Sequence, residues 1–344
     1  MKEQINVGIV GVGVYLPSAT MSAKEISQAT NGVWSEQAVI EKLGIVKKYL
    51  PNVDDGTQEM GARAALNCLE NTKVNPLDID VILCIGEEWK EFPLTTSACY
   101  IQDRIGAKNA WGIDLQNRCC TCVSAMKIAA DMLRADESIN TIMICGGYRN
   151  GDFVDYTDKN MSMMYNLSAG GGAIILKKNY GKNLLLGSKI ISDGSLARTA
   201  GVEIGGTVHP FNHENVDWGY KTLRLFEPVK MKETLNEVSM PNWYKCIDDS
   251  LAQAGLTRKD IGYLDVLHMK RSGHNSMLAE LGLSPEQTVY LEEYGHVGQI
   301  DQILSLKLGI EQGKVVDGTV VCMIAAGIGY VWSANVIRWG TGKD

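Results

Sequence analysis

The sequence predicts an α/β protein whose strands are covered by helices on both faces. Runs at 81–85, 141–145 and 319–324 are almost continuously apolar, which is typical of strands buried on both sides. Stretches with an apolar residue at every third or fourth position alternate with these runs, as amphipathic helices do. Alternation of this kind over 344 residues indicates a layered α/β architecture.

The same order of elements occurs twice along the chain. Each copy has a helical stretch, a turn, an apolar strand, a short helix, a second strand and a closing apolar strand. The first copy places them at 60–69, 75–80, 81–85, 97–105, 110–115 and 141–145, and the second at 247–254, 257–262, 263–267, 275–281, 288–291 and 319–324. We therefore expect two pseudo-twofold halves, 1–176 and 177–344, whose matching turns bring Cys119 and His296 to one site.

Cys119 lies where an apolar strand passes into a helix with the core-facing residues Met126 and Leu133. Unpaired backbone N–H groups and the helix dipole favour a thiolate at such a place, so Cys119 is the leading candidate for a nucleophile. Two alternatives are a buried structural thiol and a redox pair or half of a zinc site formed with Cys122. A zinc site needs about four ligands, and the remaining cysteines are scattered singly, so we expect no metal.

Composition and charge argue against several other classes of protein. The chain is 45% hydrophobic and 21% charged with a net charge of −7, and it has no basic cluster of the kind that binds nucleic acid. No run approaches the roughly 18 to 20 apolar residues of a membrane span. The first residues do not resemble a signal peptide, and nine cysteines without one indicate reduced thiols. We expect a cytoplasmic protein that binds neither nucleic acid nor membrane.

The opening glycines suggest a dinucleotide-binding motif, but their context argues against it. Gly8, Gly11 and Gly13 lead into Tyr15 and Pro17 rather than into a helix. The helix N-terminus that would hold a pyrophosphate is therefore missing, and we expect no nucleotide cofactor at this turn.

Four segments in the same order resemble the thiolase superfamily, most closely its ketoacyl-ACP synthase III group and the related HMG-CoA synthases. They lie at 8–17, 41–48, 114–119 and 325–338, over nearly the full length of the chain. The resemblance implies a thiolase-like fold of two βαβαβαββ halves in a layered α-β-α-β-α structure. It also implies a homodimer that takes acyl-CoA or acyl-carrier-protein thioesters as substrates and holds no permanently bound cofactor.

The resemblance also implies catalytic roles by position. Cys119 would be acylated by a thioester, and His268 matches a histidine that serves the second substrate. His296 stands where the synthase III group has an asparagine and related chain-elongating enzymes have a histidine. Two imidazoles there would hold a thioester carbonyl while it becomes an enolate. The backbone N–H groups of Cys119 and Ile328 would form the oxyanion hole.

Several other positions carry secondary expectations. Glu88 matches the general acid/base of HMG-CoA synthases, but the preferred interpretation of its charged surroundings is a solvated surface loop, because the C-terminal motifs resemble that branch less. Asp301 and Gln299 are expected only to cap the helix that follows them. Three histidines are expected to be surface or supporting groups: His209, His213 and His274.

Departures from the family leave the substrates open. Trp34 and Lys42 lie off register from the family residues that contact the adenine end of CoA, and the segment 168–173 lacks the usual carboxylate. The preferred hypothesis is a decarboxylating condensation of an acyl group on Cys119 with a malonyl-type thioester. The alternatives are a non-decarboxylating condensation like that of HMG-CoA synthase, acyl transfer to a hydroxyl or amine, and a subunit that retains only the fold.

Overall fold

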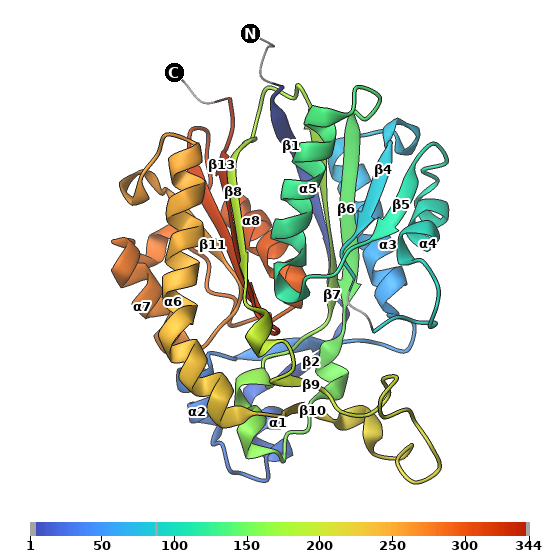
Figure 1. The fold of residues 1–344 in the computed structure, drawn as a ribbon, viewed down its shortest axis with the longest axis vertical. Helices are drawn as coiled ribbons and strands as arrows, with labels where there is room; N and C mark the ends of the chain where they lie inside the picture. The colour runs from blue at the N-terminus through green and yellow to red at the C-terminus, as the bar shows by residue number, and fades with distance from the viewer. Residues whose placement is uncertain (1–4, 87–88, 342–344) are drawn as a thin grey trace.

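The computed structural model describes residues 5–86 and 89–341 of the chain. Within these ranges, nine strands form a mixed sheet in the order β11-β12-β13-β8-β1-β7-β6-β4-β5, and two small sheets pair β2 with β3 and β9 with β10 (Figure 1). The strands are β1 (Val7–Tyr15), β2 (Ala19–Ser22), β3 (Lys47–Leu50), β4 (Val81–Cys84), β5 (Trp111–Asp114), β6 (Thr141–Tyr148), β7 (Gly170–Lys178), β8 (Leu184–Ser192), β9 (Ala200–Val202), β10 (Leu223–Leu225), β11 (Tyr263–Val266), β12 (Val320–Gly327) and β13 (Val331–Arg338).

Helices pack on the outer faces of this sheet and between its two parts. They are α1 (Ala23–Ala29), α2 (Glu36–Ala38), α3 (Thr57–Thr72), α4 (Ser97–Ile105), α5 (Thr121–Ala135), α6 (Pro228–Gln253), α7 (Arg271–Leu281) and α8 (Asp301–Glu311). None of these described helices combines the length and the apolar composition needed to cross a membrane.

The main sheet has two parts, which meet at the pairing of Gly8 in β1 with Leu184 in β8. Strands β5, β4, β6, β7 and β1 form one part, and β8, β13, β12 and β11 form the other. Helix α3 packs on the outside of the first part, α6 packs on the outside of the second, and α5 and α8 contact strands of both (Figure 1). This arrangement confirms the expected α/β fold with its α-β-α-β-α layers.

The apolar runs form strands of the main sheet, as their patterns predict. They become β4, β6 and β12, and every residue of β4 and β6 is buried. The predicted boundary between residues 176 and 177 falls inside β7. The assignment of 1–176 and 177–344 to two related halves stays a prediction.

The opening glycines allow close packing between a strand and a helix. A Cβ atom on Gly13 would lie 2.3 Å from the backbone nitrogen of Cys68 and 2.4 Å from the carbonyl oxygen of Ala64, both in α3. Contacts this short leave no room for a side chain. The glycine-rich β1 therefore serves the packing of α3.

Candidate active site

Cys119 lies in a tight 3-10 turn, Arg118–Cys120, directly before α5. The Thr121 hydroxyl ties this turn together: it accepts a hydrogen bond from the backbone N–H of Asn117 at 2.8 Å and donates to the Arg118 carbonyl at 2.5 Å. Arg118 has φ +53°, a left-handed conformation that side chains other than glycine rarely adopt. Such backbone outliers cluster at functional sites, and here the turn presents Cys119 at the head of a buried helix.

The three neighbouring cysteines differ in exposure. Cys119 is half-buried, whereas Cys120 and Cys122 are buried completely. Burial raises the pKa of both buried thiols, and Cys120 donates a hydrogen bond to the Val331 carbonyl at 3.3 Å. Of the three, only Cys119 is partly exposed.

His296 and Asp301 lie in line behind this thiol. The Nε2 atom of His296 is 3.1 Å from Cys119 Sγ, and its Nδ1 atom is 2.5 Å from Asp301 Oδ2. Burial by itself lowers the pKa of His296, but the carboxylate of Asp301 and the sulfur of Cys119 raise the pKa well above its usual value. The arrangement is a cysteine–histidine–carboxylate triad, in which the carboxylate orients the ring and stabilises its charged form.

Asp301 therefore does more than cap a helix. It is the first residue of α8, but its fully buried carboxylate turns back toward the site. Oδ1 accepts a hydrogen bond from the backbone N–H of Val297 at 2.7 Å, and Oδ2 accepts one from the backbone N–H of His268 at 2.8 Å. The sequence pattern marks the helix start but not this role, because nothing local distinguishes a cap from a carboxylate that faces a histidine five residues earlier.

His268 follows β11 and joins the site through its backbone. Its ring nitrogens have other partners: Nδ1 lies 2.8 Å from Asn166 Nδ2, and Nε2 lies 2.9 Å from the Gly44 carbonyl oxygen. Burial lowers the pKa of His268 to about 4, so the ring is neutral. The structure thus places Cys119 against His296 and connects His268 to them through Asp301.

The hairpin between β12 and β13 packs against the Cys119 turn. A Cβ atom on Gly327, at the end of β12, would lie 3.2 Å from the Cys119 backbone nitrogen and 2.9 Å from Arg118 Cβ. Ile328 is the next residue, so its backbone is close to the same turn. This is the neighbourhood in which the sequence predicts an oxyanion hole.

The remaining predicted positions have varied surroundings. Glu88 lies outside the described residues. Trp34 packs partly buried against the core, whereas Lys42 is exposed.

The three other histidines differ in their surroundings. His209 and His213 are exposed, and His274 is buried with its ring edge-on to the Tyr290 ring, at a centroid distance of 4.8 Å. Because the Tyr290 ring also stacks on His268 at 5.5 Å, His274 supports the site from behind.

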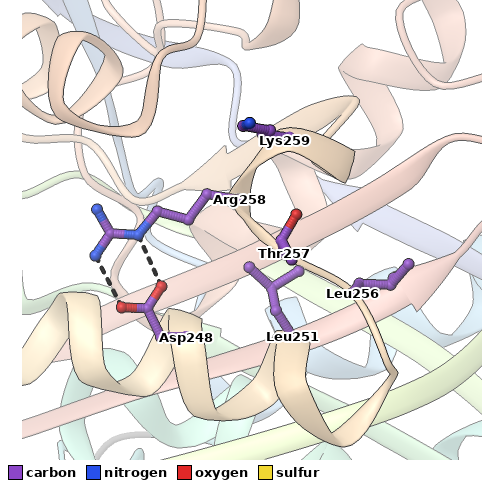
Figure 2. Close-up of a pocket in the computed structure, with 6 residues that line it drawn as sticks. All are labelled: Asp248, Leu251, Leu256, Thr257, Arg258 and Lys259. Carbon is purple, nitrogen blue, oxygen red and sulfur yellow. Dashed lines mark hydrogen bonds and ion pairs between the residues drawn. The ribbon is translucent and has the colours of Figure 1, made fainter.

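A hollow on the outer surface is separate from this site. It lies between the end of α6 and the turn that follows, where Arg258 pairs with Asp248 at 2.7 Å (Figure 2). Leu251, Leu256, Thr257 and Lys259 complete its lining. Neither Cys119 nor the two site histidines contribute to it, so we assign it no catalytic role.

Comparisons with known proteins agree with the geometry. Residues 113–194 match the family model 3-oxoacyl-[acyl-carrier-protein] synthase III, and residues 251–339 match the model of its C-terminal part. β-Ketoacyl-[acyl-carrier-protein] synthase III of Syntrophomonas wolfei is 25% identical over 99% of each chain, and that of Microcystis aeruginosa is 29% identical over 97% of this chain and 98% of its own.

The fold agrees as well. The crystal structure of 3-oxoacyl-[acyl-carrier-protein] synthase III from Aquifex aeolicus superimposes with a TM-score of 0.83 and 19% identity, covering 97% of this chain and all of that one. The two family-model matches include the Cys119 turn, His268 and His296, and the two curated relatives match nearly the full length of the chain. The chain belongs to the thiolase superfamily, as a condensing enzyme of the 3-oxoacyl-[acyl-carrier-protein] synthase III-like type.

Proposed function

We propose that this condensing enzyme carries an acyl group on Cys119 and joins it to a malonyl-type thioester, which loses carbon dioxide and yields a 3-oxoacyl thioester. The observation that carries this proposal is the 3.1 Å contact between Cys119 Sγ and His296 Nε2, with Asp301 behind the ring. It supplies the activated nucleophile that acyl-enzyme formation requires.

In the first half-reaction, Cys119 sulfur attacks the carbonyl carbon of an acyl thioester. His296 takes the thiol proton and keeps it on Nε2, and the departing thiolate is protonated by solvent, so that the two half-reactions together consume one proton. The backbone N–H groups of Cys119 and Ile328 are the proposed donors to the oxyanion, and the contact of Gly327 with the Cys119 turn supports their proximity.

In the second half-reaction, the malonyl carboxylate leaves as carbon dioxide and its electron pair forms an enolate. Nε2–H groups of His268 and His296 are the proposed donors to the enolate oxygen. The carbanion attacks the acyl carbonyl, and Cys119 leaves as a thiolate. The neutral His268 ring, whose Nε2 faces a carbonyl in the free enzyme, supports its role as a donor.

A two-stage assay tests this function. Intact-protein mass after incubation with a panel of acyl-CoAs should show one acyl group on the wild type, and none on C119A or on C119A/C120A, which excludes capture by the neighbouring thiol. Addition of malonyl-CoA or malonyl-carrier protein should then release carbon dioxide and clear the acyl group. Acylated Cys119 with no carbon dioxide from any pair would contradict the condensation.

The triad also favours a second candidate, acyl transfer to a hydroxyl or amine. A carboxylate on His296 Nδ1 suits a ring that removes a proton from an acceptor as well as from Cys119. Loss of the acyl group to such acceptors, without gas release, distinguishes this function from condensation.

We further propose a cytoplasmic homodimer that takes acyl-CoA or acyl-carrier protein and needs no permanently bound cofactor. Strand β5 ends the main sheet with a free edge, and Trp111 and Ile113 on it are exposed over 50% and 43% of their surface. Exposed apolar edge strands tend to pair with another strand, and a second copy of the chain supplies an identical strand.

A further inference from the structure

Asn166 touches the elements that carry both histidines. Its side-chain Nδ2 lies 2.8 Å from His268 Nδ1, and its backbone carbonyl accepts a hydrogen bond from the His296 N–H at 2.7 Å. The residue is buried between them. No sequence pattern marks it, and the reaction steps above do not use it.

The Gly44 carbonyl determines which nitrogen of His268 carries the proton. A carbonyl oxygen only accepts, so Nε2, 2.9 Å away, carries N–H and donates to it. In a neutral ring Nδ1 is then a bare acceptor, and the Asn166 amide N–H is its donor. If the Asn166 amide were flipped, its Oδ1 would face His268 Nδ1, and Nδ1 would then have to carry the proton. His268 Nε2 would have no proton and would face the Gly44 carbonyl oxygen. The first arrangement makes two hydrogen bonds, whereas the second makes one and adds a repulsion.

His296 is the charged ring of the two. Its Nδ1 faces the Asp301 carboxylate and its Nε2 faces the Cys119 sulfur, and both groups raise its pKa, which favours a proton on each ring nitrogen. The free enzyme thus pairs a charged ring with the nucleophile and keeps the other ring as a neutral donor. Such a division fits a reaction in which acylation precedes condensation.

Several hydrogen bonds anchor the segment that holds Asn166. Ser168 N–H donates to the His296 carbonyl at 2.9 Å, and the ammonium group of fully buried Lys48 donates to the Leu167 carbonyl at 2.7 Å. The backbone N–H of Tyr49 donates to the Ser168 hydroxyl at 2.8 Å. These bonds fix the backbone that carries Asn166, as a positioning group requires.

We propose that Asn166 is a positioning residue that holds His268 in the tautomer with its proton on Nε2, ready to donate to the carbonyl of the second substrate. This rests on the proposed function, in which that carbonyl takes the place of the Gly44 oxygen as the acceptor. The assignment of the tautomer itself does not depend on the reaction.

Nitrogen NMR of the free enzyme labelled with ¹⁵N-histidine tests the tautomer, because ring nitrogens with and without a proton resonate in separate ranges. The spectrum of H268Q identifies the His268 signals. We expect a bare Nδ1 and a protonated Nε2 in the wild type. In N166D a carboxylate, which only accepts, replaces the amide donor, so Nδ1 should gain a proton.

The matched control is N183D. Asn183 is also buried and donates to a backbone carbonyl, that of Ile9, at 2.8 Å. It directly precedes Leu184, which pairs with Arg338 at the end of the sheet opposite the β12–β13 hairpin. N183D should leave the His268 signals unchanged. A protonated Nδ1 in the wild type, or a His268 spectrum that N166D does not alter, would overturn the proposal.

A second variant, N166L, separates the two half-reactions. Leucine cannot donate, so the condensation rate should fall about 10²-fold, the usual loss for one donor to a developing oxyanion. Acylation of Cys119 should stay within about twofold, because His296 and Asp301 are retained. An equal fall in the acylation and condensation rates would show that Asn166 has only a structural role. If the wild type condenses no malonyl thioester, the proposed function fails while the NMR result still decides the tautomer.

Discussion

Both oxygens of Asp301 accept hydrogen bonds from groups that the site needs in fixed positions: the His296 ring and the backbone N–H groups of Val297 and His268. The carboxylate is fully buried, and a buried charge is tolerated only with partners of this kind. Asp301 therefore connects the base at Cys119 to the histidine proposed for the second substrate.

The variant D301N tests whether the site needs the negative charge of Asp301 or only the volume of its side chain. The amide keeps the volume, but it removes the negative charge and turns one acceptor into a donor that opposes the existing N–H groups. We expect acylation of Cys119 to slow by about 10² to 10⁴, the range for a misoriented or uncharged catalytic base. Rapid-mixing intact-protein mass measures the rate. D131N, at an exposed carboxylate of α5, should acylate at the wild-type rate, and a D301N rate equal to wild type would contradict the triad.

The buried histidines make the fold sensitive to acid. Burial lowers the pKa of His274, like that of His268, to about 4, whereas an unfolded histidine titrates near 6.5. Between these values the unfolded chain binds more protons, so the free energy of unfolding falls as the pH falls. Each ring accounts for a loss of about 2 kcal/mol by pH 5.

H274F should remove one of these two contributions. Phenylalanine keeps the edge-on contact with Tyr290, and His274 Nδ1 has no hydrogen-bond partner among the described residues, so no bond is lost at that nitrogen. We expect the variant to lose about 2 kcal/mol less unfolding free energy than the wild type between about pH 7.5 and about pH 5, in urea titrations. H209Q, at an exposed histidine, should follow the wild type. If the free energy of unfolding of H274F changed with pH as much as that of the wild type, His274 would not be held neutral in the folded protein.

The β12–β13 hairpin and the Cys119 turn lie in close contact. Gly327 permits that contact, because any Cβ there meets Arg118 Cβ at 2.9 Å and the Cys119 nitrogen at 3.2 Å. The two proposed oxyanion donors, the N–H groups of Cys119 and Ile328, belong to these two elements. Their separation therefore depends on this single small residue.

G327A should push the two elements apart by a few tenths of an ångström. We expect the acylation rate to fall at least about tenfold, because oxyanion stabilisation depends steeply on donor distance, while the melting temperature changes little. G206A is the control, since a Cβ on Gly206 meets nothing within 4 Å. Unchanged acylation in G327A would place the oxyanion donors elsewhere.

Sequence patterns were sufficient for the elements and for part of the site. Continuous apolar runs predicted β4, β6 and β12, and the strand-to-helix change predicted the position of Cys119 before α5. The repeated order of elements anticipated that Cys119 would meet His296, 177 positions away in the chain.

Other site residues left no such signal. Asn166 reaches His268 across 102 positions, and its amide is indistinguishable in sequence from one in any loop. Asp301 fits a helix-capping pattern, and only the three-dimensional path of the 296–301 segment turns its carboxylate toward the ring. His268 matches a family position, but the partners of its ring nitrogens follow from contacts with two distant segments.

For the whole molecule, the two edges of the main sheet differ. All four residues of β11, at one edge, are buried, whereas β5, at the other, exposes Trp111 and Ile113. Phe92 and Leu94, in the segment before α4, add further exposed apolar surface, at 67% and 104% of their reference areas. This unequal distribution supports the proposed homodimer through β5.

The double variant W111E/I113E should disrupt such a dimer. Two like charges on each copy of the edge strand oppose each other across a twofold axis. Native mass spectrometry should give two chains for the wild type and one for the variant, with the circular dichroism spectrum preserved. V229E, at an exposed apolar residue of α6, should remain dimeric. A W111E/I113E protein with two chains would exclude β5 as the interface.

The segment 166–168 has a consequence for any attempt to divide or rearrange the gene. It precedes β7, whereas both histidines that it supports come after residue 260. A C-terminal fragment alone would contain the two imidazoles without the amide and carbonyl that orient them, and an N-terminal fragment would contain Cys119 without a base. Complementation between co-expressed fragments, or circular permutation with new termini in an exposed loop, is the route that keeps these parts together.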